Sequence, residues 1–275
     1  MLLGGVIAAA TMLMLSKLRN DAIVDGGREL ENLALVLAEY TDRAFQSVAL
    51  VEANLLEQAQ ARRPVTHEDF ERQMSGQAVH LMLKDKASGM PHVGSLTLIN
   101  ADGKLTNFSR FWPLPKIDVT DRDFFQVLKS NSQLTYYLGE PVLNRATGSW
   151  TVHLVRRVSG PHGEFFGLIL GAMEMDYFER YFGTITLGEG SSITLIRQDG
   201  RFLARYPHVE NGSHLSFGGS PLFKDVLAKA QSGVSRLTSL SDGQDRLVPN
   251  WDVGRRSRPA DVRRSHGPAG VPTER

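Results

Sequence analysis

The feature that most constrains the fold is a pattern that occurs twice. The segments SLTLI, from Ser95, and SITLI, from Ser192, each end two residues before an Asp-Gly pair, at a constant offset of 97 residues. Apolar and β-branched residues before Asp-Gly predict an antiparallel hairpin. A helix-like segment follows each hairpin, FFQVLKS from Phe124 and LFKDVLA from Leu222. Because the offset is the size of a small domain, the sequence predicts two tandem copies of one module.

The first copy, residues 64–183, is predicted to be complete. Thr66 and Asp69 form a capping pattern that begins a helix, and the alternating segments after the short helix predict three further antiparallel strands. The second copy, residues 184–248, lacks the apolar pattern of the closing strands. The predicted fold class is α+β: a long N-terminal helix followed by two tandem PAS-like modules with antiparallel sheets, the second truncated.

A long helix is predicted ahead of both copies, over residues 17–63. Its apolar side chains recur at spacings of three and four and form one stripe, which consists of Leu30, Leu33, Leu37, Tyr40, Ala44, Val48, Val51 and Leu55. Two interpretations stay open and can hold for different parts of the helix. It is either a core helix of its own domain or a stalk that pairs in a homodimer.

The two ends of the chain differ in composition from the rest. Residues 1–16 begin with a 15-residue apolar run, which extends about 22 Å as a helix, short of the roughly 30 Å bilayer core. We interpret this segment as a membrane anchor, with a secretory signal peptide or a buried helix as alternatives. Residues 249–275 are rich in arginine and have no apolar period, which predicts either a disordered basic tail or a frameshifted end.

Composition and motifs argue against several functions. The chain has no cysteine, which excludes disulfides, thiolate metal sites and cysteine catalysis. Its net charge of +1 gives no overall attraction to nucleic acid. It has no P-loop, nucleophile elbow or HExxH motif, and its eight histidines show no metal-ligand spacing. We therefore predict no enzyme activity, no catalytic residues, no cofactor, no metal and no nucleic-acid partner.

Three segments in order resemble one family: DVTDRDFF from Asp118, TGSWTVHLVRRVSGPHGEFFGLILGAMEMDYFERYF from Thr147, and ITLIRQDGRFLARYP from Ile193. They are similar to the double-Cache (PDC) sensor regions of bacterial diguanylate cyclases and sensor histidine kinases. The resemblance covers roughly residues 20–248. It implies a periplasmic small-molecule sensor, anchored in the inner membrane, whose output domain is absent from this chain. A free periplasmic ligand-binding protein is the alternative.

The resemblance places the ligand in the first copy, between the sheet and the segments that cover it. The candidate residues are polar or aromatic: Arg110, Trp112, Asp121, Arg122, Tyr137, Trp150, His153 and Arg156. A buried arginine needs an anionic partner, which a ligand carboxylate would supply. Strand alternation puts Trp150 and Arg156 on one face and His153 on the other. Purely structural roles stay open for all of these residues.

Overall fold

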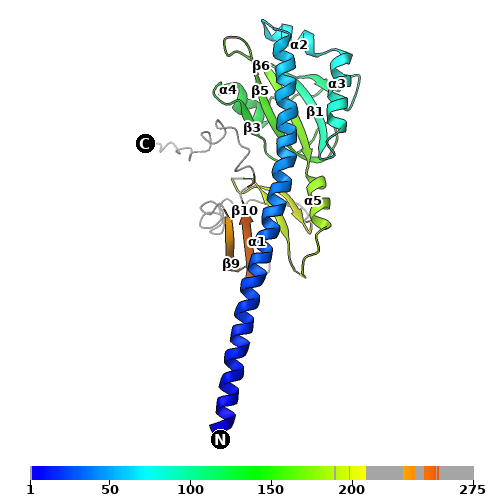
Figure 1. The fold of residues 1–275 in the computed structure, drawn as a ribbon. Helices are drawn as coiled ribbons and strands as arrows, with labels where there is room; N and C mark the ends of the chain where they lie inside the picture. Colours follow the sequence, from blue (N-terminus) through cyan, green and yellow to red (C-terminus); the bar gives the residue numbers. More distant parts are fainter. Residues whose placement is uncertain are drawn as a thin grey trace. The chain divides into compact units, whose positions relative to one another are not determined.

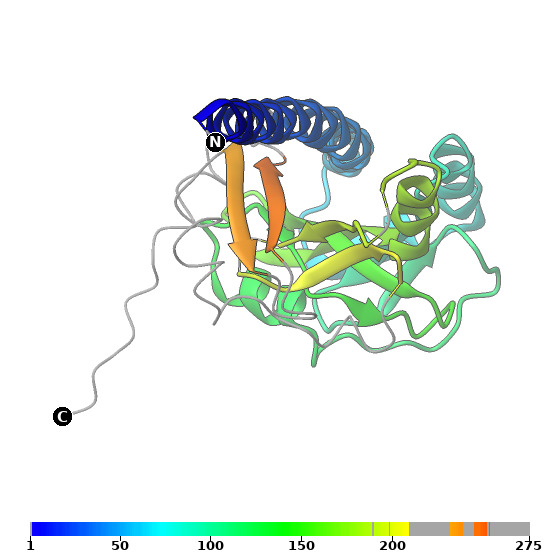
Figure 2. The ribbon, with the colours of Figure 1, turned by 90° about the horizontal axis from the view of Figure 1, so that it is seen from below.

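The chain forms two compact units in the computed structural model, which describes residues 2–188, 190–197, 199–208, 232–238, 245–251 and 253. One unit combines residues 2–42 with an antiparallel hairpin of β9 (Ser232–Thr238) and β10 (Asp245–Trp251), drawn in orange in Figures 1 and 2. The other unit, described from residue 43 to residue 208, holds the remaining strands and the candidate site.

Helix α1 (Leu2–Ala61) is the longest element, and its 60 residues correspond to about 90 Å of helix. Part of the predicted apolar stripe is buried, and Val48 and Leu55 are completely so. Other members, such as Leu30, are only half-buried. Among the described residues, no helix has the length and apolarity needed to cross a membrane. The anchor at residues 1–16 stays a prediction.

The unit that contains the candidate site is built on a six-stranded antiparallel sheet. Its order is β2-β1-β6-β5-β3, and β4 also pairs with β5. The strands are β1 (Val93–Asn100), β2 (Leu105–Phe108), β3 (Tyr136–Leu138), β4 (Val142–Leu143), β5 (Trp150–Ser159) and β6 (Phe165–Glu174). The first hairpin and the three later strands predicted from the sequence are thus confirmed. Nearly all side chains of the central strands β5 and β6 are buried, because both faces of the sheet are covered.

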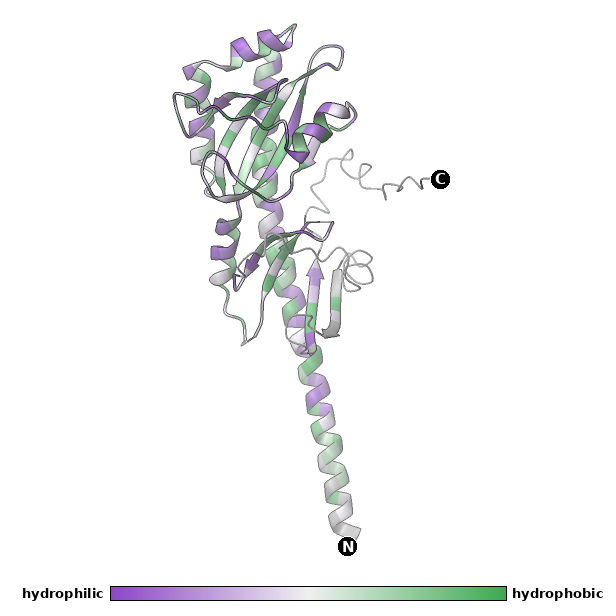
Figure 3. Ribbon diagram, turned by 180° about the vertical axis from the view of Figure 1, so that it is seen from behind, coloured by the Kyte–Doolittle hydropathy of each residue, from purple (hydrophilic) through white to green (hydrophobic). Residues whose placement is uncertain are grey.

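Helices cover the two faces of the sheet unequally. The last part of α1 lies on one face with α2 (His67–Met74) and α3 (Gln77–Ser88), whereas α4 (Asp123–Ser130) lies on the other (Figures 1 and 3). Neighbouring residues of β6 show the alternation: Leu170 joins the core under α4, and a Cβ at Gly171 would lie 2.2 Å from the Val48 side chain of α1. Gly171 therefore permits the close approach of α1.

The core beneath α4 is a cluster of aliphatic and aromatic side chains. Its buried members are Ile99, Val119, Phe124, Phe125, Leu128, Val155, Leu168 and Leu170. The helix presents Phe124, Phe125 and Leu128 to the sheet, which is the apolar spacing of an amphipathic helix. The predicted capping pattern of α2 is also confirmed, because the Thr66 hydroxyl accepts a hydrogen bond of 3.2 Å from the Asp69 amide.

The sequence repeat is also a repeat of conformation. In the first hairpin Thr97, Leu98 and Ile99 pair with Phe108, Asn107 and Leu105. After α5 (Met175–Gly183), strands β7 (Ile193–Ile196) and β8 (Phe202–Tyr206) pair Thr194, Leu195 and Ile196 with Arg205, Ala204 and Phe202. The two hairpins therefore have the same strand register, and the register shift after Leu98 recurs after Leu195, 97 residues later. Gly103 and Gly200 both have positive φ, which an Asp-Gly turn requires.

The later part of the second copy differs in one respect from the sequence-based boundaries. The tail was predicted to begin at Pro249, but β10 continues to Trp251 and pairs Pro249 with Val234. A proline is compatible with a two-stranded hairpin, since its missing N–H can lie on the unpaired edge. The helix predicted at Leu222 and nearly all of residues 252–275 lie outside the described residues. The other domain boundaries stay predictions.

Candidate ligand-binding site

A cavity of about 40 Å³ opens on the α4 face of the six-stranded sheet. The sheet supplies its floor through Thr97, Ile99 and Leu170, the start of α4 one wall, and the loop between β4 and β5 another. The polar lining residues include Arg122, Asn144, Arg145 and His153. The arrangement is an apolar pocket with a few converging polar groups, as is usual for small-molecule sites.

Arg122 is the first cationic group of the pocket. It occupies the N-cap position of α4, without a capping hydrogen bond from its side chain. Its Nη2 donates to the Leu143 carbonyl at 3.1 Å. Burial lowers the pKa of its guanidinium, and the charge of Arg145 lowers it further, while Asp121 and Asp123 act in the opposite direction. The guanidinium thus carries a charge in a partly desolvated place, where an anionic ligand would be stabilised.

His153 on β5 faces the pocket and is 9% exposed. Its ring centroid lies 5.3 Å from that of Phe124. Burial, and secondarily the charge of Arg122, lowers the pKa of His153 to about 4, so the imidazole is neutral at physiological pH. Its Nδ1 has no hydrogen-bond partner among the described residues. A buried polar nitrogen without a partner is costly, and a ligand could satisfy it.

Arg145 and Asn144 line the pocket but were not among the predicted residues. Arg145 holds the Asp121 carboxylate with two hydrogen bonds, of 2.8 and 2.6 Å, and also donates to the Asp118 carbonyl. This fork lowers the pKa of Asp121 and raises that of Arg145. The sequence signal for this loop was its turn chemistry, because Asn144 and Gly148 close it through a backbone hydrogen bond of 2.8 Å.

Of the eight predicted site residues, only Arg122 and His153 line the cavity. Asp121 does not line the cavity itself, but it accepts a hydrogen bond from Arg145, which does. Tyr137 packs against the core under α4, where burial, then the charge of Asp123, raises its pKa. Trp150, 37% exposed, lies at the start of β5.

Two further predicted residues lie near the ends of β1 and β2 and not in the pocket. Arg110 pairs with Glu174 at 3.4 Å. Trp112 is 40% exposed and stacks on His80, with ring centroids 5.5 Å apart. The sequence grouped these side chains with the site because they follow the first hairpin, but neither lines the cavity. Their predicted contact with a ligand stays a prediction.

Arg156 lies on the face of the sheet opposite the pocket, so its predicted contact with a ligand stays a prediction. Its guanidinium carbon lies 4.5 Å from the Tyr136 ring centroid, and its Nη2 donates to the Ala49 carbonyl of α1 at 3.5 Å. Beside it, the Glu52 carboxylate is completely buried and accepts a 2.9 Å hydrogen bond from the Gly171 amide. On this face Arg156 thus contacts Tyr136 and α1, and it lies beside the Glu52 side chain.

Glu52 has a strongly raised pKa on this face. Burial raises its pKa to about 8, although Tyr136, Arg156 and the Gly171 amide act to lower it. Burial, followed by the charge of Glu52, raises the pKa of the Tyr136 hydroxyl. Glu52 is not part of the apolar stripe predicted for this helix, and the sequence did not predict this cluster. Its neighbours Val51 and Leu55 do not indicate that a distant β-sheet packs over the Glu52 side chain.

The pocket is therefore suited to bind a small anion. Its walls are mostly apolar, and its polar groups are the guanidinium groups of Arg122 and Arg145, the Asn144 amide and the neutral His153 imidazole. This combination is suited to a carboxylate. Within the described part of the chain, no group of three or more His, Cys, Asp or Glu side chains could hold a metal ion.

Comparisons with known proteins agree with this arrangement. The family model dCache_1-like, described as a histidine kinase sensor domain, matches residues 175–255. No curated protein matches the sequence. The extracellular domain of the histidine kinase candidate rpHK1S-Z16 is 27% identical, with a TM-score of 0.70 over 85% of this chain and 92% of that one.

Two chemoreceptor domains share the fold at lower identity. The periplasmic sensory domain of Tlp1 from Campylobacter jejuni is 12% identical, with a TM-score of 0.65 over 82% of this chain and 90% of that one. The ligand-binding domain of the amino acid chemoreceptor PctC from Pseudomonas aeruginosa PAO1, solved with GABA, is 16% identical, with a TM-score of 0.53 over 78% and 89%.

Fold and matches together define the class of protein as the ligand-sensing region of a bacterial signalling receptor. Within that class, residues 175–255 match the dCache_1-like sensor model, and the fold is similar to the sensor domains of histidine kinases and chemoreceptors. The link to diguanylate cyclases, which the sequence resemblance also implied, stays a prediction.

Proposed function

We propose that this chain senses a small carboxylate in the pocket beneath α4, as the extracytoplasmic region of a membrane-anchored receptor. One observation carries the proposal. The cavity brings the Arg122 guanidinium and the unpartnered Nδ1 of His153 to the same small space. A carboxylate could pair with the partly buried guanidinium and accept a hydrogen bond from the buried imidazole, which would satisfy both groups.

The size of the cavity limits the ligand. A buried water needs about 10–15 Å³ of such space, so about 40 Å³ holds a few waters or a ligand of similar size. We therefore expect a monocarboxylate with a short chain, of which acetate is the smallest useful probe. Larger ligands include GABA, with which the PctC domain was solved, and L-valine, with which the ligand-binding domain of the Campylobacter jejuni chemoreceptor Tlp3 was solved. In this chain, ligands of that size would require displacement of the loop that carries Asn144 and Arg145.

The receptor context is part of the same proposal. Residues 1–16 would anchor the chain in the inner membrane, the sensor region would lie in the periplasm, and a histidine kinase or diguanylate cyclase would provide the output. Exposed Val36 and Leu50 on α1 are two heptads apart and support pairing of α1 with a second copy. The alternative is a free periplasmic ligand-binding protein, for which the mature N-terminus would lie near Lys17.

The test is a thermal-shift and calorimetry screen of short monocarboxylates and amino acids against the full chain. A ligand at 100 times its Kd should add about 2.7 kcal/mol of stability, or about 5–10 °C in Tm. Arg122→Gln and His153→Ala should abolish the shift. Arg110→Gln is the matched control, because Arg110 pairs with Glu174 outside the pocket. A shift that survives in both pocket variants would place the ligand elsewhere and refute the proposal.

A further inference from the structure

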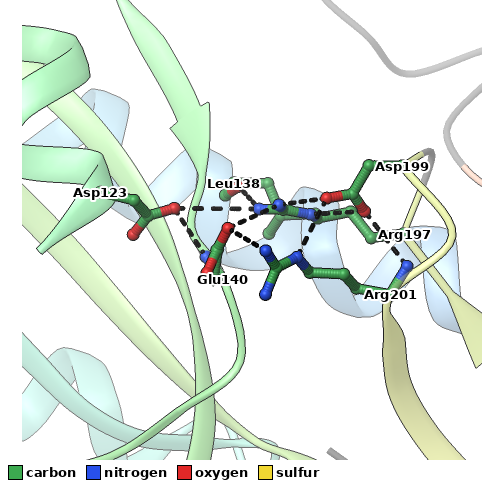
Figure 4. Close-up of polar contacts among 6 residues, drawn as sticks. All are labelled: Asp123, Leu138, Glu140, Arg197, Asp199 and Arg201. Carbon is green, nitrogen blue, oxygen red and sulfur yellow. Dashed lines mark hydrogen bonds and ion pairs between the residues drawn. The ribbon is translucent and has the colours of Figure 1, made fainter. Parts of the chain in front are cut away.

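The turn after β7 carries an arginine that reaches the first copy of the module. Arg197 has a side chain only 13% exposed, and its Nη1 donates to the Leu138 carbonyl at 3.0 Å (Figure 4). The same guanidinium lies 3.9 Å from the Asp123 carboxylate and 3.6 Å from that of Glu140. Asp199 holds its other edge with hydrogen bonds of 3.0 and 2.5 Å. We call these five residues the Arg197 clamp.

The acidic side of the Arg197 clamp is continuous with the ligand pocket. Asp123 is the first residue of α4, directly between Arg122 and Phe124, which both line the cavity. Its Oδ2 also accepts a 2.9 Å hydrogen bond from the Glu140 amide. The neighbouring Gly139 amide donates to the His153 carbonyl at 2.8 Å. A segment of three residues, 138–140, thus contacts Arg197 and the strand that carries His153.

The repeat indicates that the side chain of Arg197 is not needed to close its own turn, which its backbone closes with Gly200 and Arg201. Its counterpart in the first copy, 97 residues earlier, is Asn100, whose Oδ1 accepts from the amides of Asp102 and Lys104. In the second copy Asp199 provides the corresponding acceptor for the Arg201 amide, at 3.2 Å. Asp199 also orients the Arg197 guanidinium, which leaves the long side chain to extend toward Leu138 and Asp123.

We propose that Arg197 is a positioning residue of the ligand pocket, and that the Arg197 clamp couples pocket occupancy to the β7–β8 hairpin. By holding Asp123 and residues 138–140, it fixes the start of α4 and therefore the placement of Arg122. Because coupling between two sites is reciprocal, a ligand that shifts Arg122 must also change the stability of the hairpin. The coupling rests on the proposed function, whereas the positioning role does not.

Hydrogen exchange on the full chain without ligand tests the positioning role. In Arg197→Gln, the Glu140 amide should exchange about tenfold faster or more, since its acceptor Asp123 loses its tether. Arg197→Lys should recover part of the protection. Arg180→Gln is the matched control, because Arg180 forms an exposed pair with Asp176 on α5, away from the Arg197 clamp. Faster exchange confined to residues 193–206 would overturn the proposal and leave Arg197 with a role in its own hairpin only.

Acetate binding tests the coupling. Arg197→Gln should weaken acetate binding about tenfold, and Asp123→Asn should add little more in the double variant, because both residues act through one clamp. Acetate should slow exchange of residues 193–206 in the natural chain and not in Arg197→Gln. Additive losses, or protection that persists in the variant, would overturn the coupling. If acetate does not bind the natural chain, the proposed ligand class fails, while the exchange of Glu140 still decides the positioning role.

Discussion

His153 and Arg156 stand three residues apart on β5 and end in opposite environments. His153 faces a cavity, whereas Arg156 contacts the Tyr136 ring and the Ala49 carbonyl of α1. The α1 face is covered by the last part of α1, against which its polar side chains pack. The α4 face keeps a cavity, so its polar groups are available to a ligand. One strand therefore supports a structural interface on one side and a candidate recognition site on the other.

The largest expected effect lies on the α1 face, in the dependence of stability on pH. The pKa of Glu52 is about 8 in the folded chain and near 4.5 when unfolded, so the folded state retains a proton that the unfolded state releases. Stability should therefore fall as pH rises from about 4.5 to 8, by up to about 1.4 kcal/mol per pH unit. Glu52→Gln should flatten this loss in urea denaturation at pH 6.5–8.5. An unchanged slope would mean that Glu52 ionises at its ordinary pKa.

The second effect is the loss of stability when a buried side chain between α1 and the sheet is truncated. Leu55 on α1 is completely buried, so Leu55→Ala should lower the free energy of unfolding by about 2–5 kcal/mol. Leu50→Ala is the control on the same helix, since Leu50 is 70% exposed and should change stability by less than about 0.5 kcal/mol. Equal losses in the two variants, measured by urea denaturation, would contradict the packing of α1.

The α4 face should respond to pH in the opposite sense. The pKa of His153 is about 4 when folded and near 6.5 when unfolded, so the unfolded state binds the extra proton. Its contribution to stability should be present above pH 6.5 and be lost as pH falls through about 4. His153→Asn should reduce the acid-side loss without altering the alkaline side. NMR titration of the imidazole checks this, and a pKa near 6.5 in the folded chain would refute it.

The smallest effect is expected at the rim of the pocket. Asp121 pairs with Arg145 in an exposed setting, with 61% of the Asp121 side chain accessible. Asp121→Asn should therefore change stability by only about 0–1 kcal/mol, less at high salt. Ligand affinity should change more than stability, because Arg145 would be released toward the cavity. A stability loss well above this range would show that the pair holds the loop between β4 and β5.

The sequence was sufficient for the elements formed by local patterns. The long helix, the capping pattern at Thr66, both Asp-Gly hairpins and their repeat depend on spacing and turn residues within short windows, and all are present. Alternation also separated His153 from Arg156 correctly. A period of two assigns residues to two faces, however, and it does not say which face a helix will cover. Both residues were therefore predicted as ligand contacts.

Only the tertiary structure decided which polar groups are buried together. Glu52 and Arg156 are 104 positions apart, Asp123 and Arg197 are 74 apart, and neither pair has a local signature in the sequence. The raised pKa of Glu52 and the ion pair between Asp123 and Arg197 arise when distant segments exclude water from the same place. By itself the sequence determined which helices and strands form and that the hairpin is duplicated, because those depend on local backbone preference and periodicity. The closed face, the pocket and the Arg197 clamp depend on long-range packing, which no short window encodes.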